Sequence, residues 1–393
     1  MVIEPRIVKN ICLTAHPLGC ARQVEDQIGY IRNRPPISGT AEAPNKVLVV
    51  GSSNGYGLAS RIVAAYGCSA ATVGVAFERP GSDAKPGSAG WYNDRAFLET
   101  AGRDGLAAWS LNGDAFSEEL KQEALQVIRD HLGGVDLVIY SIASPRRQDP
   151  KTGVLYSSVI KPVGSAFTGR TVDFQTGVVS QVTAEPATSE KEIEDTVRVM
   201  GGEDWALWIE ALERERLLSE GATTVAFSYI GPSFTAPIYR EGTIGKAKEH
   251  LERTAKDLNR RLEGRGGRAL VSVNKALVTR ASAVIPAVPL YIALLYRVMK
   301  DRSLHEVCIH QMDRLFRDYL YAPAPLPLDE EGRIRLDDRE MSPEVQEEVA
   351  RRWNQVSTEN VELLTDIAGF REEFLQYHGF GVPGIDYGAD VEP

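Results

Sequence analysis

Short runs of apolar residues alternate with amphipathic segments along most of the chain. A continuous apolar run of about four to eight residues is typical of a strand that is buried on both faces. Apolar residues three and four positions apart are typical of helices that cover such strands. The expected strands are KVLVV (46–50), ATVGVAF (71–77), LAAWSLNGD (106–114), VDLVIYSIA (135–143), TTVAFSYIG (223–231) and RALVSVNKALV (268–278). This order predicts an α/β fold with a doubly wound parallel sheet of the Rossmann type.

Two kinds of segment interrupt the alternation. Residues 145–200 are rich in Val, Thr, Ser and Gly and show no helical period before about Glu190, which predicts inserted β-hairpins. A long apolar helix is expected over Ala281–Met299, after the last strand of the alternating pattern. The N-terminus, MVIEPRIVKNICLTAHPLG, has the pattern of a strand.

We expect one integrated domain over residues 1–393, with extra N- and C-terminal segments. Its parts are a Rossmann core at 45–144 and 220–300, a β-rich insertion at 145–200, covering helices at 281–320 and a C-terminal extension at 321–393. The extension should hold a short β segment near GRIRL and helices from about Pro343 to Tyr377.

Composition narrows the classes of protein to consider. The net charge is −10, from 44 basic and 54 acidic residues, which argues against a nucleic-acid binder. The four cysteines form no CxxC pair and are typical of reduced thiols in a cytoplasmic protein. We expect no secretory signal, because the N-terminus has no long apolar run. We also expect no membrane insertion, because the most apolar stretch is short and is broken by Pro286 and Pro289. His305 and His310 are five residues apart and do not share a helical face, so no metal site is expected.

A glycine turn follows the first strand of the core and opens a helix. The residues Gly51, Gly55 and Gly57 would let the backbone turn sharply and approach a pyrophosphate at the helix N-terminus. Glu78 ends the second strand, 21 residues after Gly57, where a carboxylate binds the ribose diol of a dinucleotide. This favours NADH over NADPH, although the neighbouring Arg79 is able to accept a 2′-phosphate. For an isolated motif, an ordinary glycine turn is an equally good interpretation.

Two further positions lie where the ligands of open sheets bind. Asp114 follows the third strand and is a candidate for the adenine amino group, with a solvated loop aspartate as the alternative. Ala143 ends the fourth strand at the carboxyl edge, together with Ser141 and Ile142.

Tyr239 and a following lysine are the candidate proton-transfer pair. A phenol has a pKa of about 10, and a nearby ammonium favours the phenolate. Lys248 shares a helical stripe with Leu251, Ala255, Leu258 and Leu262, so it should point towards the sheet, after a helix start at which Thr243 is the N-cap. Lys246 lies on the stripe of His250, Arg253, Asp257 and Arg260, a solvated face. Tyr229 ends the preceding strand and is either a second catalytic tyrosine or a core residue.

With these residues in place, the whole chain resembles the trans-2-enoyl-CoA and enoyl-acyl-carrier-protein reductases (FabV/TER), an enlarged and divergent branch of the short-chain dehydrogenases. The matching stretches are TAHPLGC, GYGLASR, FERPG, GSAGWYN, NGDAFS, SPRRQDPKTG, MGGEDW, IGKAKEHL, ALVTRAS, EGRIRLDD and FGVPGIDYGADV. The family's Tyr-x8-Lys spacing fits Tyr239 and Lys248, whereas Tyr239 and Lys246 fit the Tyr-x6-Lys spacing of smaller enoyl reductases.

The resemblance implies NADH-dependent reduction of the trans-2 double bond of an enoyl-CoA or enoyl-carrier-protein thioester in fatty acid synthesis, by a monomer. Tyr239, Lys248 and Tyr229 would be catalytic, with Tyr239 stabilising an enolate and Lys248 lowering its pKa. Tyr229, Ile285 and Pro286 would contact the acyl chain. The expected cofactor residues are Gly51, Ser52, Gly55, Tyr56, Gly57, Phe77, Glu78, Asp114, Ala143, Lys248 and Thr279.

Some charged residues bear on the substrate. Arg240 and Arg280 stand where the family usually has tryptophan and glutamine, and would add positive charge near the substrate entrance. Arg146, Arg147 and Lys151 are candidates for the phosphates of the thioester carrier, with a salt-bridged loop as the alternative.

Two other functions use the same residues. A short-chain ketone or alcohol dehydrogenase would need the same Tyr–Lys pair, but usually adds a serine where Tyr229 stands. A catalytically inactive dinucleotide-binding protein would bind NADH without turnover.

Overall fold

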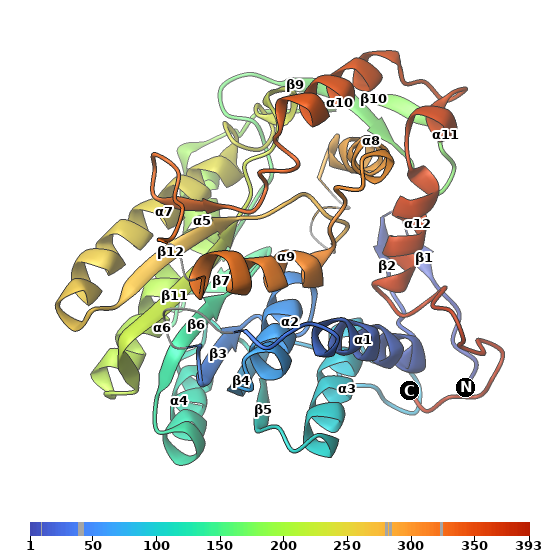
Figure 1. The fold of residues 1–393 in the computed structure, drawn as a ribbon. Helices are drawn as coiled ribbons and strands as arrows, with labels where there is room; N and C mark the ends of the chain where they lie inside the picture. Colours follow the sequence, from blue (N-terminus) through green and yellow to red (C-terminus); the bar gives the residue numbers. More distant parts are fainter. Residues whose placement is uncertain (9, 38–42, 280–281, 283–284, 323–324) are drawn as a thin grey trace.

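A seven-stranded parallel sheet runs through the centre of the molecule. The computed structural model describes residues 1–393 apart from 9, 38–42, 280–281, 283–284 and 323–324. All neighbouring strands of the sheet pair in parallel, in the order β5-β4-β3-β6-β11-β12-β13 (Figure 1). Its strands are β3 (Lys46–Val50), β4 (Ala71–Ala76), β5 (Ala108–Asn112), β6 (Val135–Tyr140), β11 (Leu218–Ser228), β12 (Arg268–Val273) and β13 (Arg333–Arg335).

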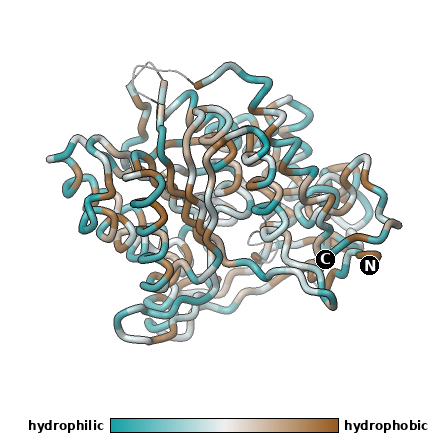
Figure 2. Tube along the Cα trace, turned by 90° about the horizontal axis from the view of Figure 1, so that it is seen from below, coloured by the Kyte–Doolittle hydropathy of each residue, from teal (hydrophilic) through white to brown (hydrophobic). Residues whose placement is uncertain are grey.

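Helices cover both faces of the sheet, which explains why its central strands β3 and β6 are mostly apolar. In Figure 2 the hydrophobic residues are concentrated along the strands in the middle of the molecule. On one face lie α4 (Glu118–Val127), α6 (Glu203–Arg214) and α7 (Thr243–Leu262). On the other lie α1 (Pro17–Arg32), α2 (Gly55–Ile62), α3 (Ala89–Arg103) and α9 (Cys308–Arg314).

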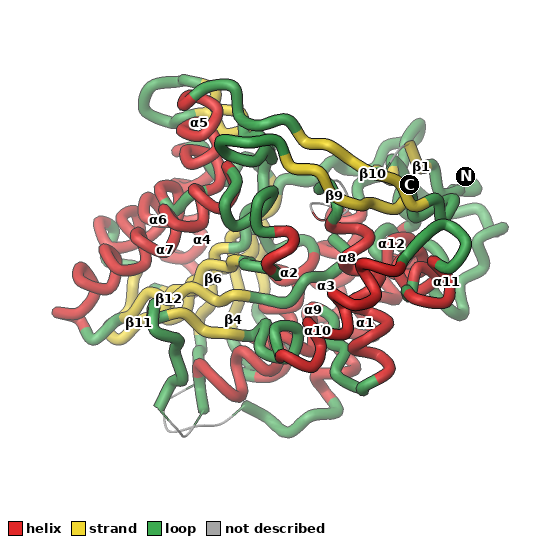
Figure 3. Tube along the Cα trace, turned by 90° about the horizontal axis from the view of Figure 1, so that it is seen from above, coloured by secondary structure: helices red, strands yellow, loops and turns green. Residues whose placement is uncertain are grey.

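A third group of elements lies over the carboxyl edge of the sheet. Its apolar cluster joins α8 and the C-terminal helices to Tyr239, Ala276 and Ile285. Arg170, on a hairpin beside α8 (Figure 3), donates to the carbonyl oxygens of Trp353 and Val356 at 3.0 Å. These elements are β9 (Phe167–Val172), β10 (Val179–Ala184), α8 (Val288–Asp301), α10 (Pro343–Gln355), α11 (Val361–Leu364) and α12 (Ile367–Gln376).

The remaining elements lie at the periphery. The N-terminal hairpin meets the C-terminal end, where the Met1 amino group donates to the carbonyl oxygen of Val391 at 2.8 Å (Figure 1). These elements are β1 (Ile7–Val8), β2 (Ile11–Cys12), β7 (Arg146–Gln148), β8 (Leu155–Ser157) and α5 (Glu190–Met200). None of the helices in the described part of the chain is long and apolar enough to cross a membrane.

The fold class expected from the sequence is confirmed, including the hairpins inserted after β6. Three details differ. The β segment near GRIRL is the seventh strand of the main sheet, because β13 pairs with β12. The N-terminal strand pattern covers a short hairpin followed by α1, which starts at Pro17. The apolar helix begins at Val288 and not at Ala281, because Ala287 adopts a left-handed conformation (φ 66°) and Pro289 lies in the first helical turn.

A buried arginine ties α2 to the sheet. Arg61 is completely buried and donates to Asp94 and Ser110 at 2.8 Å, and its guanidinium lies 4.4 Å from the centre of the Phe97 ring. Gly74 on β4 leaves room for it, because a Cβ atom at that position would overlap the guanidinium.

We therefore predict that Gly74→Ala destabilises the fold. Overpacking of this kind costs about 1–3 kcal/mol, measurable as a lower midpoint of urea unfolding. Gly102→Ala on α3 is the matched control, because nothing lies within 4 Å of its added Cβ and alanine favours the helix. Equal midpoints for Gly74→Ala and the unchanged chain would contradict the steric account.

Candidate active site

The glycine turn lies between β3 and α2, beside the point where the order of the sheet reverses. Strands β4 and β5 are added to the sheet on one side of β3, and the later strands, beginning with β6, are added on its other side. This change of direction leaves a crevice at the carboxyl ends of β3 and β6. Gly51 has a φ of 92°, a conformation that favours glycine. A Cβ atom on Gly57 would overlap the Gly51 carbonyl oxygen. Ser52 is fully buried and its backbone N–H donates to Val75. The turn is therefore tight, and the N–H groups that remain to hold a pyrophosphate are those beyond Ser52, at the start of α2.

The expected adenosine residues stand at the end of β4. Glu78 accepts hydrogen bonds from the Ser53 hydroxyl at 2.6 Å and the Asn54 side chain at 3.2 Å. The carboxylate is thus tied to the glycine turn, on the side where a ribose diol would lie. Phe77 precedes it and is 75% exposed, so its ring is free to contact a base.

Two further expected cofactor positions, after β5 and β6, differ in character. Asp114 is half-buried and accepts from the backbone N–H of Phe116 at 3.0 Å, which leaves its second carboxylate oxygen for other contacts. Ala143 is exposed just beyond β6. Both positions follow strands at the carboxyl edge.

Two tyrosines face each other across this edge. Tyr229 follows β11, and Tyr239 lies in the loop that leads to α7. Their ring centroids are 4.9 Å apart in an edge-to-face arrangement of 77°. Among the described residues, the Tyr239 hydroxyl has no hydrogen-bond partner, whereas the Tyr229 hydroxyl donates to Glu340 at 3.0 Å. Tyr229 is half-buried beside Tyr239, and its hydroxyl hydrogen is directed at Glu340.

The helix phase that separates the two lysines is as expected. Lys248 is half-buried, and its ammonium donates to the carbonyl oxygen of Phe227 at 3.1 Å. Burial lowers its pKa to about 8. Lys246 is more exposed and pairs with Glu249 at 3.1 Å. Leu251, Ala255, Leu258 and Leu262 are all buried.

Some local expectations around these lysines are wrong. Gly242 is the N-cap of α7, and Thr243 is the first helical residue; its hydroxyl donates to Val159. His250 is half-buried, because it accepts from the backbone N–H of Gly202 at the start of α6. Burial raises the pKa of Tyr239, so the lowering expected from Lys248, whose ammonium is bound to Phe227, is not seen.

Glu340 is a central polar residue of the site that sequence reasoning missed. It is fully buried and accepts from the hydroxyls of Tyr229 and Tyr291 and from the backbone N–H of Ala276. Burial raises its pKa, and the ammonium of Lys275 offsets part of that rise. The only signal in the sequence is its place just after the β segment near GRIRL.

A hydrogen bond connects the glycine turn to the segment that follows β12. The hydroxyl of Tyr56 donates to the carbonyl oxygen of Lys275 at 2.7 Å. Lys275 is itself buried, and burial lowers its pKa to about 8. Thr279, four residues on, is half-buried and bonded to Ser282 through its N–H and hydroxyl. Tyr56 and Thr279 therefore lie on segments that meet at the crevice.

The expected substrate residues belong to the cluster above the carboxyl edge. Ile285 is buried in the same apolar cluster as Tyr239, and Pro286 beside it is half-buried. Arg240 forms an ion pair with Glu252 at 3.1 Å, so its charge is neutralised and not free at an entrance. Arg280 lies outside the described residues.

Arg147 is wrong as a candidate for carrier phosphates. Its guanidinium is buried, donating to Glu203 at 2.9 Å and to the carbonyl oxygen of Arg198 at 2.7 Å. Arg147 is instead part of a salt-bridged loop, which was the alternative interpretation. Arg146 and Lys151 are exposed.

These groups together suit proton transfer next to a bound dinucleotide. A neutral phenol with a free hydroxyl hydrogen lies at the carboxyl edge, an ammonium stands on the adjoining helix, and a phosphate-binding turn opens beside them. Such a site can stabilise negative charge on an oxygen while a nicotinamide delivers a hydride.

Three family models cover most of the chain. Residues 2–83 match the NAD(P)H binding domain of trans-2-enoyl-CoA reductase, and residues 85–321 match the trans-2-enoyl-CoA reductase catalytic region. Residues 328–391 match a model described as an enoyl reductase FAD binding domain.

Relatives match the chain from end to end. A Coxiella burnetii protein named enoyl-acyl-carrier-protein reductase (NADH) is 56% identical over 394 residues, covering 100% of this chain and 96% of that one. A Flavobacterium johnsoniae protein of the same name is 55% identical over 391 residues, covering 100% and 98%. The crystal structure of Treponema denticola trans-2-enoyl-CoA reductase in complex with NAD has a TM-score of 0.96 at 53% identity, covering 100% and 98%. The enzyme of that name from Clostridium acetobutulicum, in complex with NADH, has a TM-score of 0.96 at 46% identity, with the same coverage.

The two lysines should differ in their effect on dinucleotide binding. A hydrogen bond to a charged group contributes about 1.5–3 kcal/mol, so Lys248→Ala should raise the Kd of NADH about tenfold or more in a fluorescence titration. Lys246→Ala removes the same side chain from the exposed face and should leave the Kd within about twofold. The reverse order would refute the assignment of Lys248 as the inward lysine.

Proposed function

Because the chain belongs to the family of trans-2-enoyl-CoA and enoyl-acyl-carrier-protein reductases, we propose that it catalyses the NADH-dependent reduction of the trans-2 double bond of enoyl thioesters. The observation that carries this proposal is the pairing of Tyr239 and Tyr229 at the carboxyl edge, next to the inward Lys248 and the glycine turn. A serine in place of Tyr229 would favour a ketone substrate, and that position holds a second tyrosine.

The residues around the crevice fit NADH. The N–H groups at the start of α2, around Gly55 and Gly57, would hold the pyrophosphate, whereas Gly51 and Ser52 shape the turn because their N–H groups donate to Val75. Glu78 would accept the adenosine ribose hydroxyls, which disfavours a 2′-phosphate. Lys248 would hold the nicotinamide ribose. When bound, NADH supplies the hydride that adds to the β-carbon of the enoyl thioester.

Tyr239 is the residue proposed to act on the reacting oxygen. Addition of hydride to the β-carbon moves an electron pair onto the thioester oxygen, which becomes an enolate. The Tyr239 hydroxyl is free to donate to that oxygen, and burial keeps it protonated. A proton then adds to the α-carbon, the oxygen returns to a carbonyl, and the product is the saturated thioester.

Residues 328–391 do not fit a second dinucleotide. This segment, all of which the structure describes, holds β13, α10, α11 and α12, and no glycine lies between β13 and α10 to form a phosphate-binding turn. It instead supplies Glu340 to the tyrosines. No step of the proposed reaction therefore involves a flavin.

The identity of the thioester carrier is a further part of the proposal. We infer that both coenzyme A and carrier-protein thioesters reach the site, in fatty acid synthesis in the cytoplasm. Arg146 and Lys151 are exposed beyond β6, where they would contact phosphate groups. Covering segments on both sides of the carboxyl edge are in keeping with a monomer.

The reaction is tested by following NADH oxidation with crotonyl-CoA and with a matched enoyl-carrier thioester. General acid catalysis contributes about 10²–10⁴-fold, so Tyr239→Phe should lower kcat by at least about 100-fold. Tyr30→Phe on α1 is the control, because Tyr30 packs against His310 away from the crevice. Full activity of Tyr239→Phe would refute its role, and turnover of ketones without turnover of enoyl thioesters would favour the dehydrogenase alternative.

The lowered pKa of Lys248 predicts a pH dependence. The ammonium is charged below about pH 8 and loses its proton as the pH rises through that value, so kcat/KM should fall above about pH 8. Lys248→Arg keeps a cation at every accessible pH, and its decline should move to higher pH. Lys275 has a similarly lowered pKa, and an unchanged decline in Lys248→Arg would assign the effect to Lys275.

A further inference from the structure

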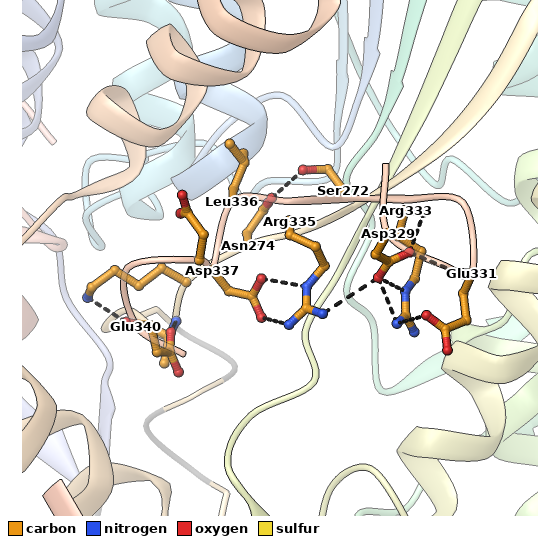
Figure 4. Close-up of polar contacts among 12 residues, drawn as sticks. Ser272, Asn274, Asp329, Glu331, Arg333, Arg335, Leu336, Asp337 and Glu340 are labelled. Atoms are coloured by element: carbon orange, nitrogen blue, oxygen red, sulfur yellow. Dashed lines mark hydrogen bonds and ion pairs between the residues drawn. The ribbon is translucent and has the colours of Figure 1, made fainter. Parts of the chain in front are cut away.

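Glu340 reaches the active site from a segment more than 90 residues beyond Lys248 in the sequence. Strand β13 precedes Glu340, and ion pairs surround it (Figure 4). Arg333 is bonded to Asp329 and Glu331, and Arg335 is bonded to Asp337. The backbone N–H groups of Leu336 and Asp337 then both donate to the carbonyl oxygen of Val273 at the end of β12. These contacts bring the following turn to the carboxyl edge of the sheet.

At that edge the Glu340 carboxylate is shared among three donors. The Tyr291 hydroxyl on α8 donates to Oε1 at 2.6 Å, and the Tyr229 hydroxyl donates to the same oxygen at 3.0 Å. The backbone N–H of Ala276 donates to Oε2 at 2.6 Å. The Glu340 carbonyl oxygen accepts from Gln346 at 2.7 Å, which fixes the turn against α10. Glu340 is therefore held by the segments that follow β11 and β12, by α8 and by α10.

This arrangement makes the two tyrosines chemically different. A phenol has a single hydroxyl hydrogen, and that of Tyr229 is committed to Glu340, so only its lone pairs remain for a ligand. Burial and the nearby carboxylate together raise the pKa of Tyr229. Tyr239 contacts the Tyr229 ring edge-to-face but keeps its own hydrogen available.

We propose that Glu340 is a positioning residue: it captures the hydroxyl hydrogen of Tyr229, holds that ring against Tyr239, and leaves Tyr239 as the only acid at the reacting oxygen. The proposal rests on the proposed enoyl thioester reduction. It assigns a function to the C-terminal segment, which completes the site by placing one carboxylate behind its tyrosines.

The test compares three variants with the wild-type chain. Glu340→Gln keeps the shape of the side chain but replaces one acceptor oxygen by an NH2 group, so it cannot accept from both the two tyrosine hydroxyls and the Ala276 N–H. It should therefore lower kcat at least about tenfold while the Kd of NADH stays within about twofold. Tyr229→Phe should lower kcat to a similar extent. Because Glu340 acts through Tyr229, adding Glu340→Gln to Tyr229→Phe should cost little more. The kcat of the double variant should lie within about threefold of the kcat of Tyr229→Phe alone. A purely structural glutamate would instead lower the melting temperature, and its loss of kcat would multiply with that of Tyr229→Phe in the double variant.

Asp204→Asn controls for the loss of a buried carboxylate that accepts a tyrosine hydroxyl. Asp204 on α6 binds the hydroxyl of Tyr140 at 3.1 Å and the ammonium of Lys121 at 2.8 Å, without contact to Tyr229 or Tyr239. Its substitution should lower the melting temperature but leave kcat within about twofold.

Three results would overturn the proposal. The first is a kcat for Glu340→Gln within about twofold of wild type. The second is a double variant whose loss equals the product of the single losses, because the residues would then act independently. The third is full activity of Tyr229→Phe, which retains the other two donors to Glu340 and decides the matter even if Glu340→Gln does not fold. If the wild-type chain reduces no enoyl thioester, the proposed function itself fails. If the wild-type chain is active but one of the three results above is obtained, only the role of Glu340 fails.

Discussion

A carboxylate buried at the carboxyl edge of the sheet is stable only if hydrogen-bond donors surround it, and this requirement organises the site. Glu340 takes its donors from the ends of β11 and β12 and from α8. The hydrogen bonds to this one carboxylate therefore join α8, the turn after β13 and the segments that follow β11 and β12. The Tyr229 ring is fixed as a consequence, and Tyr239 packs against it.

The same edge brings the glycine turn and the proposed proton-transfer residues together. Parallel strands end side by side, so the turn after β3 and the residues after β11 and β12 face one crevice although they are far apart in sequence. Tyr56 links the turn to Lys275 after β12, and Lys248 binds the backbone at the end of β11. Burial then acts in opposite directions on the two groups, raising the pKa of Tyr239 and lowering that of Lys248.

Local periodicity was sufficient to predict the sheet, the helix that carries Lys248 and the inward direction of that lysine, because each depends on a repeat within about 20 residues. Contacts between distant segments were not predictable in this way. The addition of β13 to the sheet and the burial of Glu340 depend on pairing with β12. Arg147 and Arg240 appeared available for substrate because their partners, Glu203 and Glu252, are identified only by the fold.

The central claim is that Tyr239 serves the reduction of an enoyl thioester. Turnover with NADH that carries deuterium at the transferred position, followed by NMR of the product, tests it most directly. The account predicts deuterium on the β-carbon and a solvent-derived hydrogen on the α-carbon of a saturated thioester. Deuterium on a carbinol carbon, with the carbon–carbon double bond intact, would contradict it.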